Sequence, residues 1–111
     1  MTSTDAAKIA QLNDAFRKHP HSFLDWVITT GVHALGQDFV SDAIKAVENF
    51  DSFTPDNDPH GEHDFGSFEL DGKKLFWKID YYDRNLEFGS EDPASSERTR
   101  RVMTIMLAEE Y

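Results

Sequence analysis

The chain has 111 residues, a formal net charge of −10, nine phenylalanines and no cysteine. Its length suits a single domain, residues 1–111, and 39% apolar residues are too many for an intrinsically disordered chain. The lack of cysteine excludes disulfides, thiolate zinc sites and cysteine nucleophiles, and the negative charge disfavours direct binding of nucleic acid or anionic membrane. No secretion signal and no apolar run of the ~20 residues that span a bilayer are present, so we expect a cytoplasmic protein.

Two helices and a strand are predicted in the first half of the chain. Apolar residues recur at helical spacing between Asp5 and Lys18, and His19-Pro20 ends that helix. Residues 23–30 (FLDWVITT) are β-branched and aromatic, which favours a strand. After a glycine-containing turn, a second amphipathic helix begins at Asp38, and its apolar stripe runs to Phe50.

The clearest local pattern is a β-hairpin between residues 65 and 83. Asp71-Gly72 is a favoured two-residue hairpin turn. Pairing outward from this turn makes one face of the hairpin apolar and sets Glu69 opposite Lys74 on the other face. The register that the turn requires is therefore also the register that the hydrophobic pattern requires.

The last third of the chain predicts a short strand and a helix. The strand lies around residues 86–88, and the helix begins near Asp92-Pro93 with Val102, Ile105 and Met106 on one stripe. The full pattern predicts an α+β fold. It consists of a small, mainly antiparallel sheet with a central β-hairpin, packed on one face by two to three helices that are N-terminal, middle and C-terminal.

Negative charge is concentrated in one segment. Residues 47–71 hold eight carboxylates and no lysine or arginine, whereas residues 1–45 and 73–111 each have a net charge of −1. Protein surfaces usually mix the two signs, because concentrated like charge repels itself. The block therefore indicates either a bound cation or a positively charged macromolecular partner.

The loop DNDPHGEHD, residues 56–64, contains several groups that can ligate a metal. It begins like a calcium-binding loop, but Ser67 stands where the bidentate glutamate belongs. A divalent transition metal would use the set His60, Glu62, His63 and Asp64, which defines a metal-binding regulator or metal-dependent hydrolase as the alternative function. A simpler interpretation is a turn-rich loop whose side chains cap backbone N–H groups without a metal.

The sequence contains little that is typical of an enzyme. His60 or His63 beside Asp64 would form an acid–base dyad. However, the chain has no nucleophile elbow and no glycine-rich phosphate loop to complete a catalytic set. We therefore expect a non-enzymatic protein without a cofactor.

The preferred hypothesis is a protein-binding module that docks on a basic surface of another protein. Carboxylates would speed association and give specificity, and aromatic rings among them would anchor the contact. The predicted contact residues are Asp56, Asp58, Glu62, Asp64, Phe65, Glu69, Phe76, Asp80 and Asp83. Since spaced carboxylates can stand in for phosphates, a DNA-mimic inhibitor of a nucleic-acid-binding nuclease complex is one form of this hypothesis. The plainer alternatives are an acidic surface that serves only solubility, or an accessory that docks through the exposed hairpin face.

Four segments support a family resemblance: DNDPHGEHDFGSFEL, LFWKIDYYD, GSEDP and TIMLAEEY. They resemble a family of short bacterial proteins, the domain of unknown function numbered 3768, often carried on plasmids and other mobile elements. The likeness extends roughly from Ile9 to Tyr111. It implies a mobile-element setting but no activity, and by analogy with such settings it favours an antagonist of host defence nucleases, either anti-CRISPR or anti-restriction.

Overall fold

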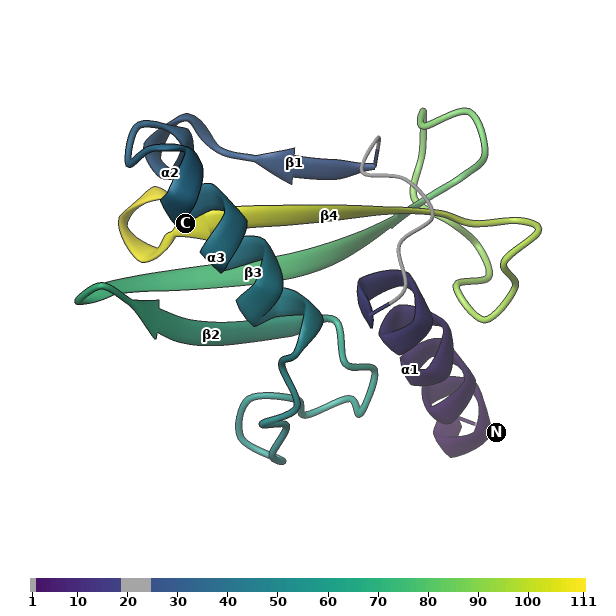
Figure 1. Cartoon of the computed structure of the whole chain (residues 1–111). Helices are drawn as coiled ribbons and strands as arrows, with labels where there is room; N and C mark the ends of the chain where they lie inside the picture. Colours follow the sequence, from purple (N-terminus) through teal and green to yellow (C-terminus); the bar gives the residue numbers. More distant parts are fainter. Residues whose placement is uncertain (1, 19–24) are drawn as a thin grey trace.

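The computed structural model of the protein describes residues 2–18 and 25–111. The elements in chain order are α1 (Thr2–Lys18), β1 (Trp26–Ile28), α2 (Thr30–His33), α3 (Gln37–Glu48), β2 (Phe65–Leu70), β3 (Lys73–Tyr82), β4 (Arg100–Leu107) and the 3₁₀ turn η1 (Ala108–Glu110) (Figure 1). The predicted α+β fold class is confirmed. None of the helices in these two ranges is long and apolar enough to cross a membrane.

The four strands form one mixed sheet in the order β1-β4-β3-β2. β1 runs parallel to β4, and the other two pairings are antiparallel. The hairpin register is confirmed, with Glu69 opposite Lys74 and Gly66 opposite Trp77. Asp71 and Gly72 both have positive φ, 52° and 77°, as a tight type I′ hairpin turn requires.

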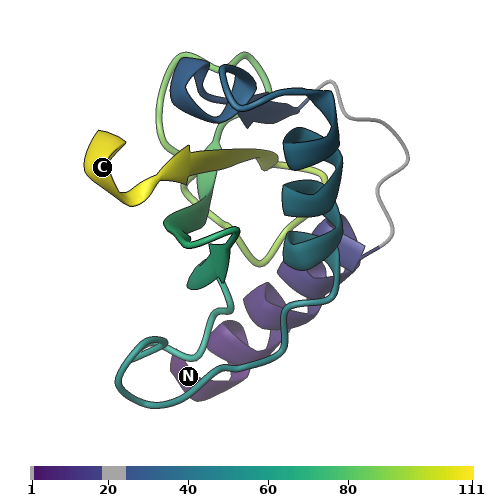
Figure 2. The ribbon, with the colours of Figure 1, turned by 60° about the vertical axis from the view of Figure 1, so that its left-hand side comes forward.

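The core lies between the sheet and the helices on one of its sides (Figures 1 and 2). From α3, the predicted stripe of Phe39, Ala43 and Val47 is buried against the sheet. Leu75 and Trp77 of β3 face this stripe and are fully buried. We call this side of the sheet the front face.

Among the described residues, no α-helix lies on the opposite side of the sheet (Figure 2), where the 3₁₀ turn η1 contacts β3 and Tyr111 packs against Phe76. We call it the open face, and the alternation of side chains along each strand defines its members. These are Val27 of β1; Phe65, Ser67 and Glu69 of β2; Lys74, Phe76, Lys78, Asp80 and Tyr82 of β3; and Arg100, Val102, Thr104 and Met106 of β4. The prediction that helices pack on one face of the sheet is therefore confirmed.

The predicted C-terminal helix is wrong. Residues 92–99 form turns and irregular backbone, and the chain then enters β4, which lies between β1 and β3. The spacing of Val102, Ile105 and Met106 fits a helix, but Met103 and Ile105 also alternate like buried residues of a strand. Pairing with a neighbour on each side decides between the two patterns. The third α-helix is instead the short α2, which was not predicted.

The predicted strand around residues 86–88 is also wrong. Leu86 has a positive φ of 59°, and the Asp83 carboxylate accepts hydrogen bonds from the N–H groups of Asn85 and Glu87, which fixes a turn. The strand predicted over residues 23–30 is confirmed only for β1, because α2 begins at Thr30. Residues 23 and 24, and the helix stop at residues 19–20, lie outside the described residues.

Candidate functional site

The candidate site is the loop between α3 and β2, residues 51–64, which we call the acidic loop. It carries five carboxylates and no lysine or arginine. Its first half is a set of local turns: the Asn57 side chain accepts from the Thr54 N–H at 2.8 Å and donates to the Ser52 carbonyl at 2.9 Å. The Asp58 N–H donates to the Thr54 carbonyl at 2.8 Å. These short-range bonds are the backbone capping that Asn, Asp and Thr provide in loops.

His63 closes the second half of the acidic loop. Its backbone has a positive φ of 56°, and its N–H donates to the Asp58 carboxylate at 3.1 Å. The imidazole stacks on the Phe53 ring with a centroid distance of 3.9 Å and an interplanar angle of 2°. Its Nδ1 lies 3.0 Å from Asp14 of α1, and its Nε2 lies 3.6 Å from the other oxygen of Asp58. One histidine therefore joins both ends of the loop to the first helix.

Arg17 of α1 holds the start of the acidic loop and is fully buried. Its Nη1 donates to the carbonyls of Val47 and Phe50, at 2.9 and 2.6 Å, at the C-terminal end of α3, where the helix dipole favours a cation. Its Nη2 bonds to Asp14 at 2.9 Å, and its guanidinium lies 5.4 Å from the centre of the Phe53 ring. Burial lowers the pKa of Arg17, while the bond to Asp14 opposes that shift.

A second buried network holds the end of the acidic loop. Asn13 of α1 donates from Nδ2 to the Glu62 carbonyl and to the Tyr81 hydroxyl, both at 2.9 Å. The Tyr81 hydroxyl donates to the Glu62 carboxylate at 3.0 Å, and Arg101 Nε donates to Asn13 Oδ1 at 2.6 Å. Burial is the main cause that raises the pKa of Tyr81 and lowers that of Arg101. The carboxylate of Glu62 is thus bonded within the protein.

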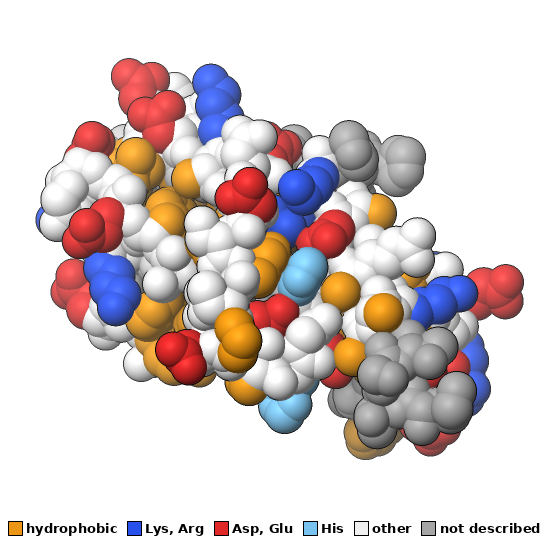
Figure 3. Space-filling view, turned by 90° about the horizontal axis from the view of Figure 1, so that it is seen from below, with side chains coloured by type: hydrophobic (Ala, Val, Ile, Leu, Met, Phe, Trp, Pro, Cys, Tyr) orange, Lys and Arg blue, Asp and Glu red, His pale blue; other side chains and the backbone are white. Residues whose placement is uncertain are grey.

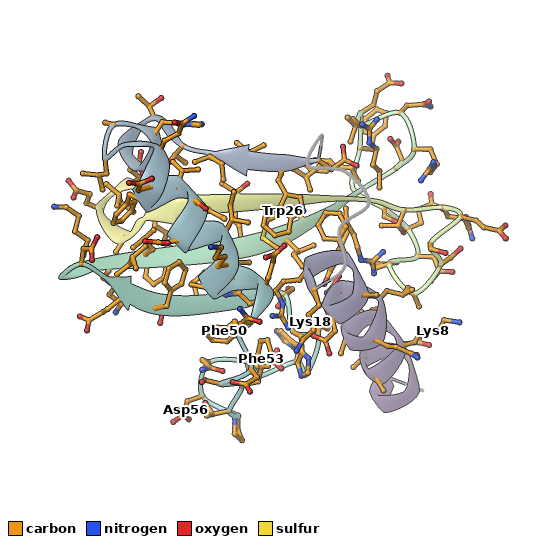
Figure 4. The ribbon with its side chains drawn as sticks, viewed as in Figure 1. Lys8, Lys18, Trp26, Phe50, Phe53 and Asp56 are labelled. Carbon is orange, nitrogen blue, oxygen red and sulfur yellow. The ribbon has the colours of Figure 1, made fainter. Side chains whose placement is uncertain are left out.

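An open groove of about 550 Å³ lies between the acidic loop and α1. Its walls combine apolar side chains with an acid and two histidines: Ala6, Ala7, Phe53, Pro55, Pro59, Asp58, His60 and His63. Figure 3 shows this end of the molecule, where histidine and carboxylate side chains lie among apolar ones. Asp51 and Asp56 are exposed, and Asp56 points away from the protein at the outer end of the loop (Figure 4).

The structure separates the predicted contact residues into three groups. Asp56, Asp58, Glu62 and Asp64 lie in the acidic loop, and burial followed by the nearby charge of Glu62 raises the pKa of Asp64. A second group lies on the open face and consists of Phe65, Glu69, Phe76 and Asp80. Asp83 forms a third group by itself. It lies in the turn after β3, where its carboxylate accepts hydrogen bonds from backbone N–H groups.

The four residues predicted as alternative metal ligands have different surroundings. His60 is exposed, the Glu62 carboxylate bonds to Tyr81, and His63 bonds to Asp14. Within residues 2–18 and 25–111, no group of three or more His, Asp or Glu side chains is arranged so that it could hold a metal ion.

Sequence reasoning missed the residues that position the acidic loop. Asn13, Asp14 and Arg17 of α1 and Tyr81 of β3 are separated from their loop partners by 19 to 49 residues. One signal was available: Asn13 and Arg17 follow Ile9 at intervals of four residues, so two polar residues interrupt a helical stripe that is buried. Buried polar residues on such a stripe need partners from elsewhere in the chain.

The fold and the site define an α+β domain in which a sheet covered by α-helices on one side carries, at one end, an acidic loop tied by hydrogen bonds to α1 and β3. A family model described as "Protein of unknown function (DUF3768)" matches residues 28–110, and the chain belongs to that family. No curated protein and no solved structure matches the chain. The matched range contains the acidic loop and β2–β4, whereas α1, which supplies Asn13, Asp14 and Arg17, precedes it.

Proposed function

We propose that the protein is a non-enzymatic binding module that docks through the acidic loop and its groove on a basic surface of a partner protein. The observation that carries this proposal is the way the loop is held. Hydrogen bonds from α1 and β3 fix it from inside, while Asp51 and Asp56 remain exposed and the groove remains open.

The hydrogen bonds that hold the loop favour binding. A flexible loop loses conformational entropy when a partner orders it, and this loss weakens association. Here Arg17, His63 and Tyr81 already fix both ends of the loop in the free protein. A partner would therefore meet a surface of defined shape.

The chemistry of the surface indicates what the partner must supply. The loop has no lysine or arginine, and the nearest guanidinium, that of Arg17, is fully buried. A complementary surface needs lysine or arginine side chains opposite Asp51 and Asp56. It also needs an apolar group or an arginine plane to pack on the walls formed by Phe53, Pro55 and Pro59.

Proteins that bind nucleic-acid phosphates present such basic surfaces. The proposed partner class is therefore a nucleic-acid-binding nuclease complex, which the protein would occlude as a DNA-mimic antagonist in a mobile-element setting. The partner would be bound by protein–protein contact, without a cofactor and without direct binding of nucleic acid or membrane by this chain.

The test compares two variants with the same change in charge. Asp51→Asn/Asp56→Asn neutralises the exposed loop carboxylates, and Glu87→Gln/Glu97→Gln neutralises two exposed carboxylates in the loop between β3 and β4. Wild-type protein immobilised in a host extract captures a basic protein, which is then purified and titrated calorimetrically. We expect the first variant to bind at least tenfold more weakly with a flatter salt dependence, and the second to bind like wild type.

Equal affinity of both variants for the captured protein would overturn the proposal. Competition by double-stranded DNA distinguishes the nuclease class, because DNA and the acidic loop would then occupy the same basic surface. Stoichiometric metal in untagged protein, together with a melting temperature that falls on addition of a chelator, would favour the metal-binding alternative instead.

A further inference from the structure

The open face carries a cluster of apolar side chains that no described α-helix covers. Its members are Val27, Phe65, Phe76, Val102 and Tyr111, which surround the buried Met106. Tyr111, which follows η1, packs edge-on against Phe65 and Phe76, with ring-centre distances of 5.9 and 5.2 Å. The Tyr111 side chain remains 75% exposed and Val27 remains 47% exposed. Aromatic rings grouped in this way are typical of the centre of a protein interface.

The charges on the open face balance, unlike those of the whole chain. The strands place two acids and three bases there: Glu69 and Asp80, with Lys74, Lys78 and Arg100. Asp25, which directly precedes β1 and pairs with Arg100, is the third acid. Lys78 and Asp80 are 3.0 Å apart, and Arg100 and Asp25 are 2.8 Å apart. The net charge of −10 is therefore carried entirely by other parts of the molecule.

This balance indicates which partner the open face fits. Two molecules of charge −10 repel each other, and contact between them is least unfavourable where the local charge is zero. A strongly basic partner would gain nothing from a neutral face and would be drawn to the acidic loop. We propose that the open face is a self-association surface that binds the same face of a second copy of this chain.

A two-fold axis suits this face, because every residue then meets the same patch on the second copy. The charge changes sign along β3 from Lys78 to Asp80, so a base of one copy can lie near an acid of the other. The aromatic clusters of the two copies would then pack at the centre. The strands of a sheet are about 4.8 Å apart and rise about 3.3 Å per residue, so four of them present a face on the order of 500 Å² on each copy. That is near the lower limit for a specific interface, so the dimer forms at high concentration and dissociates on dilution.

The test is sedimentation velocity of the full chain from about 1 µM to about 1 mM, a range that covers weak association. We expect the mass to rise from 12.7 kDa towards twice that value. Tyr111→Ser should weaken association about tenfold or more. Its matched control is Phe88→Ser, because Phe88 is 72% exposed but lies in the loop between β3 and β4. Both residues are largely exposed, so both variants are expected to fold, and circular dichroism melts verify this.

A charge pair and a salt titration separate this dimer from other modes of association. Lys78→Glu makes the open face negative and should abolish dimerisation, whereas Lys45→Glu on the exposed side of α3 changes the total charge equally and should not. Raising the salt concentration should tighten the dimer, because it screens repulsion between two acidic molecules. A monomer at about 1 mM, loosening by salt, or equal effects of the paired variants would each overturn the inference.

Discussion

The acidic loop and the open face use the same types of residue in different ways. Both contain carboxylates and aromatic rings, and an arginine bonds to a carboxylate beside each of them. Arg17 of α1, which holds the start of the acidic loop, is fully buried and bonds to Asp14 and to carbonyls at the end of α3. Arg100 on the open face keeps 37% of its side chain exposed and pairs with Asp25. The acidic loop is therefore held by buried hydrogen bonds from which water is excluded. The charges of the open face stay in contact with water.

This difference predicts where mutations should change the free energy of unfolding. Exposed ion pairs contribute about 0–1 kcal/mol, because water screens them. Buried polar groups that lose a partner cost about 1–3 kcal/mol each, since nothing replaces the lost hydrogen bond. Mutations of the residues that hold the acidic loop should therefore change the free energy of unfolding strongly. Mutations on the open face should mainly change self-association.

The largest effect is expected for Arg17→Met. The change leaves the carbonyls of Val47 and Phe50 without their buried donor and should lower the free energy of unfolding by about 3 kcal/mol. Arg100→Met is the matched variant on the open face and should lower it much less, because water screens the pair with Asp25. Urea denaturation followed by fluorescence measures both. Similar losses for the two arginines would contradict the distinction between buried and screened charges.

A second pair of variants compares adjacent residues of β2. Gly66 points to the front face, where an added Cβ would lie 2.4 Å from Trp77 Nε1, whereas Ser67 points to the open face and is exposed. Gly66→Ala should destabilise the protein by about 2 kcal/mol because it overpacks the core. Ser67→Ala should change stability by less than about 0.5 kcal/mol. Urea denaturation measures both variants. An unchanged free energy of unfolding for Gly66→Ala would show that the Trp77 ring moves aside freely.

The smallest expected effect concerns Asp64 and Glu110. Burial raises the pKa of Asp64, so its ionisation opposes folding, and Asp64→Asn should raise Tm at pH 7 by a few degrees. This gain should shrink as the pH falls through the raised pKa and vanish below the ordinary pKa of about 3.9, where the carboxyl is neutral in both states.

Glu110 should behave in the opposite way. Hydrogen bonds from Thr29 and from the backbone N–H groups of Leu107 and Gly31 lower its pKa, so the carboxylate stabilises the fold above pH 4.5. Glu110→Gln should lower Tm at pH 7, and the difference should disappear as the pH falls through the lowered pKa. Calorimetric scans between about pH 3 and pH 7 test both signs, and shifts of the same sign would contradict them.

The parts of the fold that were predictable have local signals. The hairpin follows from Asp71-Gly72 and the alternation around it, and α3 follows from its apolar stripe. β4 was missed because its apolar residues satisfy a helical and a strand period at once. Only its position between β1 and β3 decides in favour of a strand, and that position depends on residues far away in the sequence.

The candidate site was predictable in composition but not in arrangement. The acidic loop is evident from its charge, and its turns follow from Asn57, Pro55 and the other turn residues. The sequence does not show that Glu62 turns inward to Tyr81, or that His63 meets Asp14. Such pairs join elements that become neighbours only when the core forms, so no local pattern reports them.

The place of β4 in the sheet has a consequence for synthesis of the protein on the ribosome. This strand joins β1 to β3, yet it begins at Arg100, long after β1 has been made. While residues 100–107 are still inside the exit tunnel, β1 has no strand to pair with and one edge of β3 stays bare. The sheet therefore assembles in a late step that closes a long segment of chain, which slows folding and leaves the nascent hairpin open to chaperones until that step.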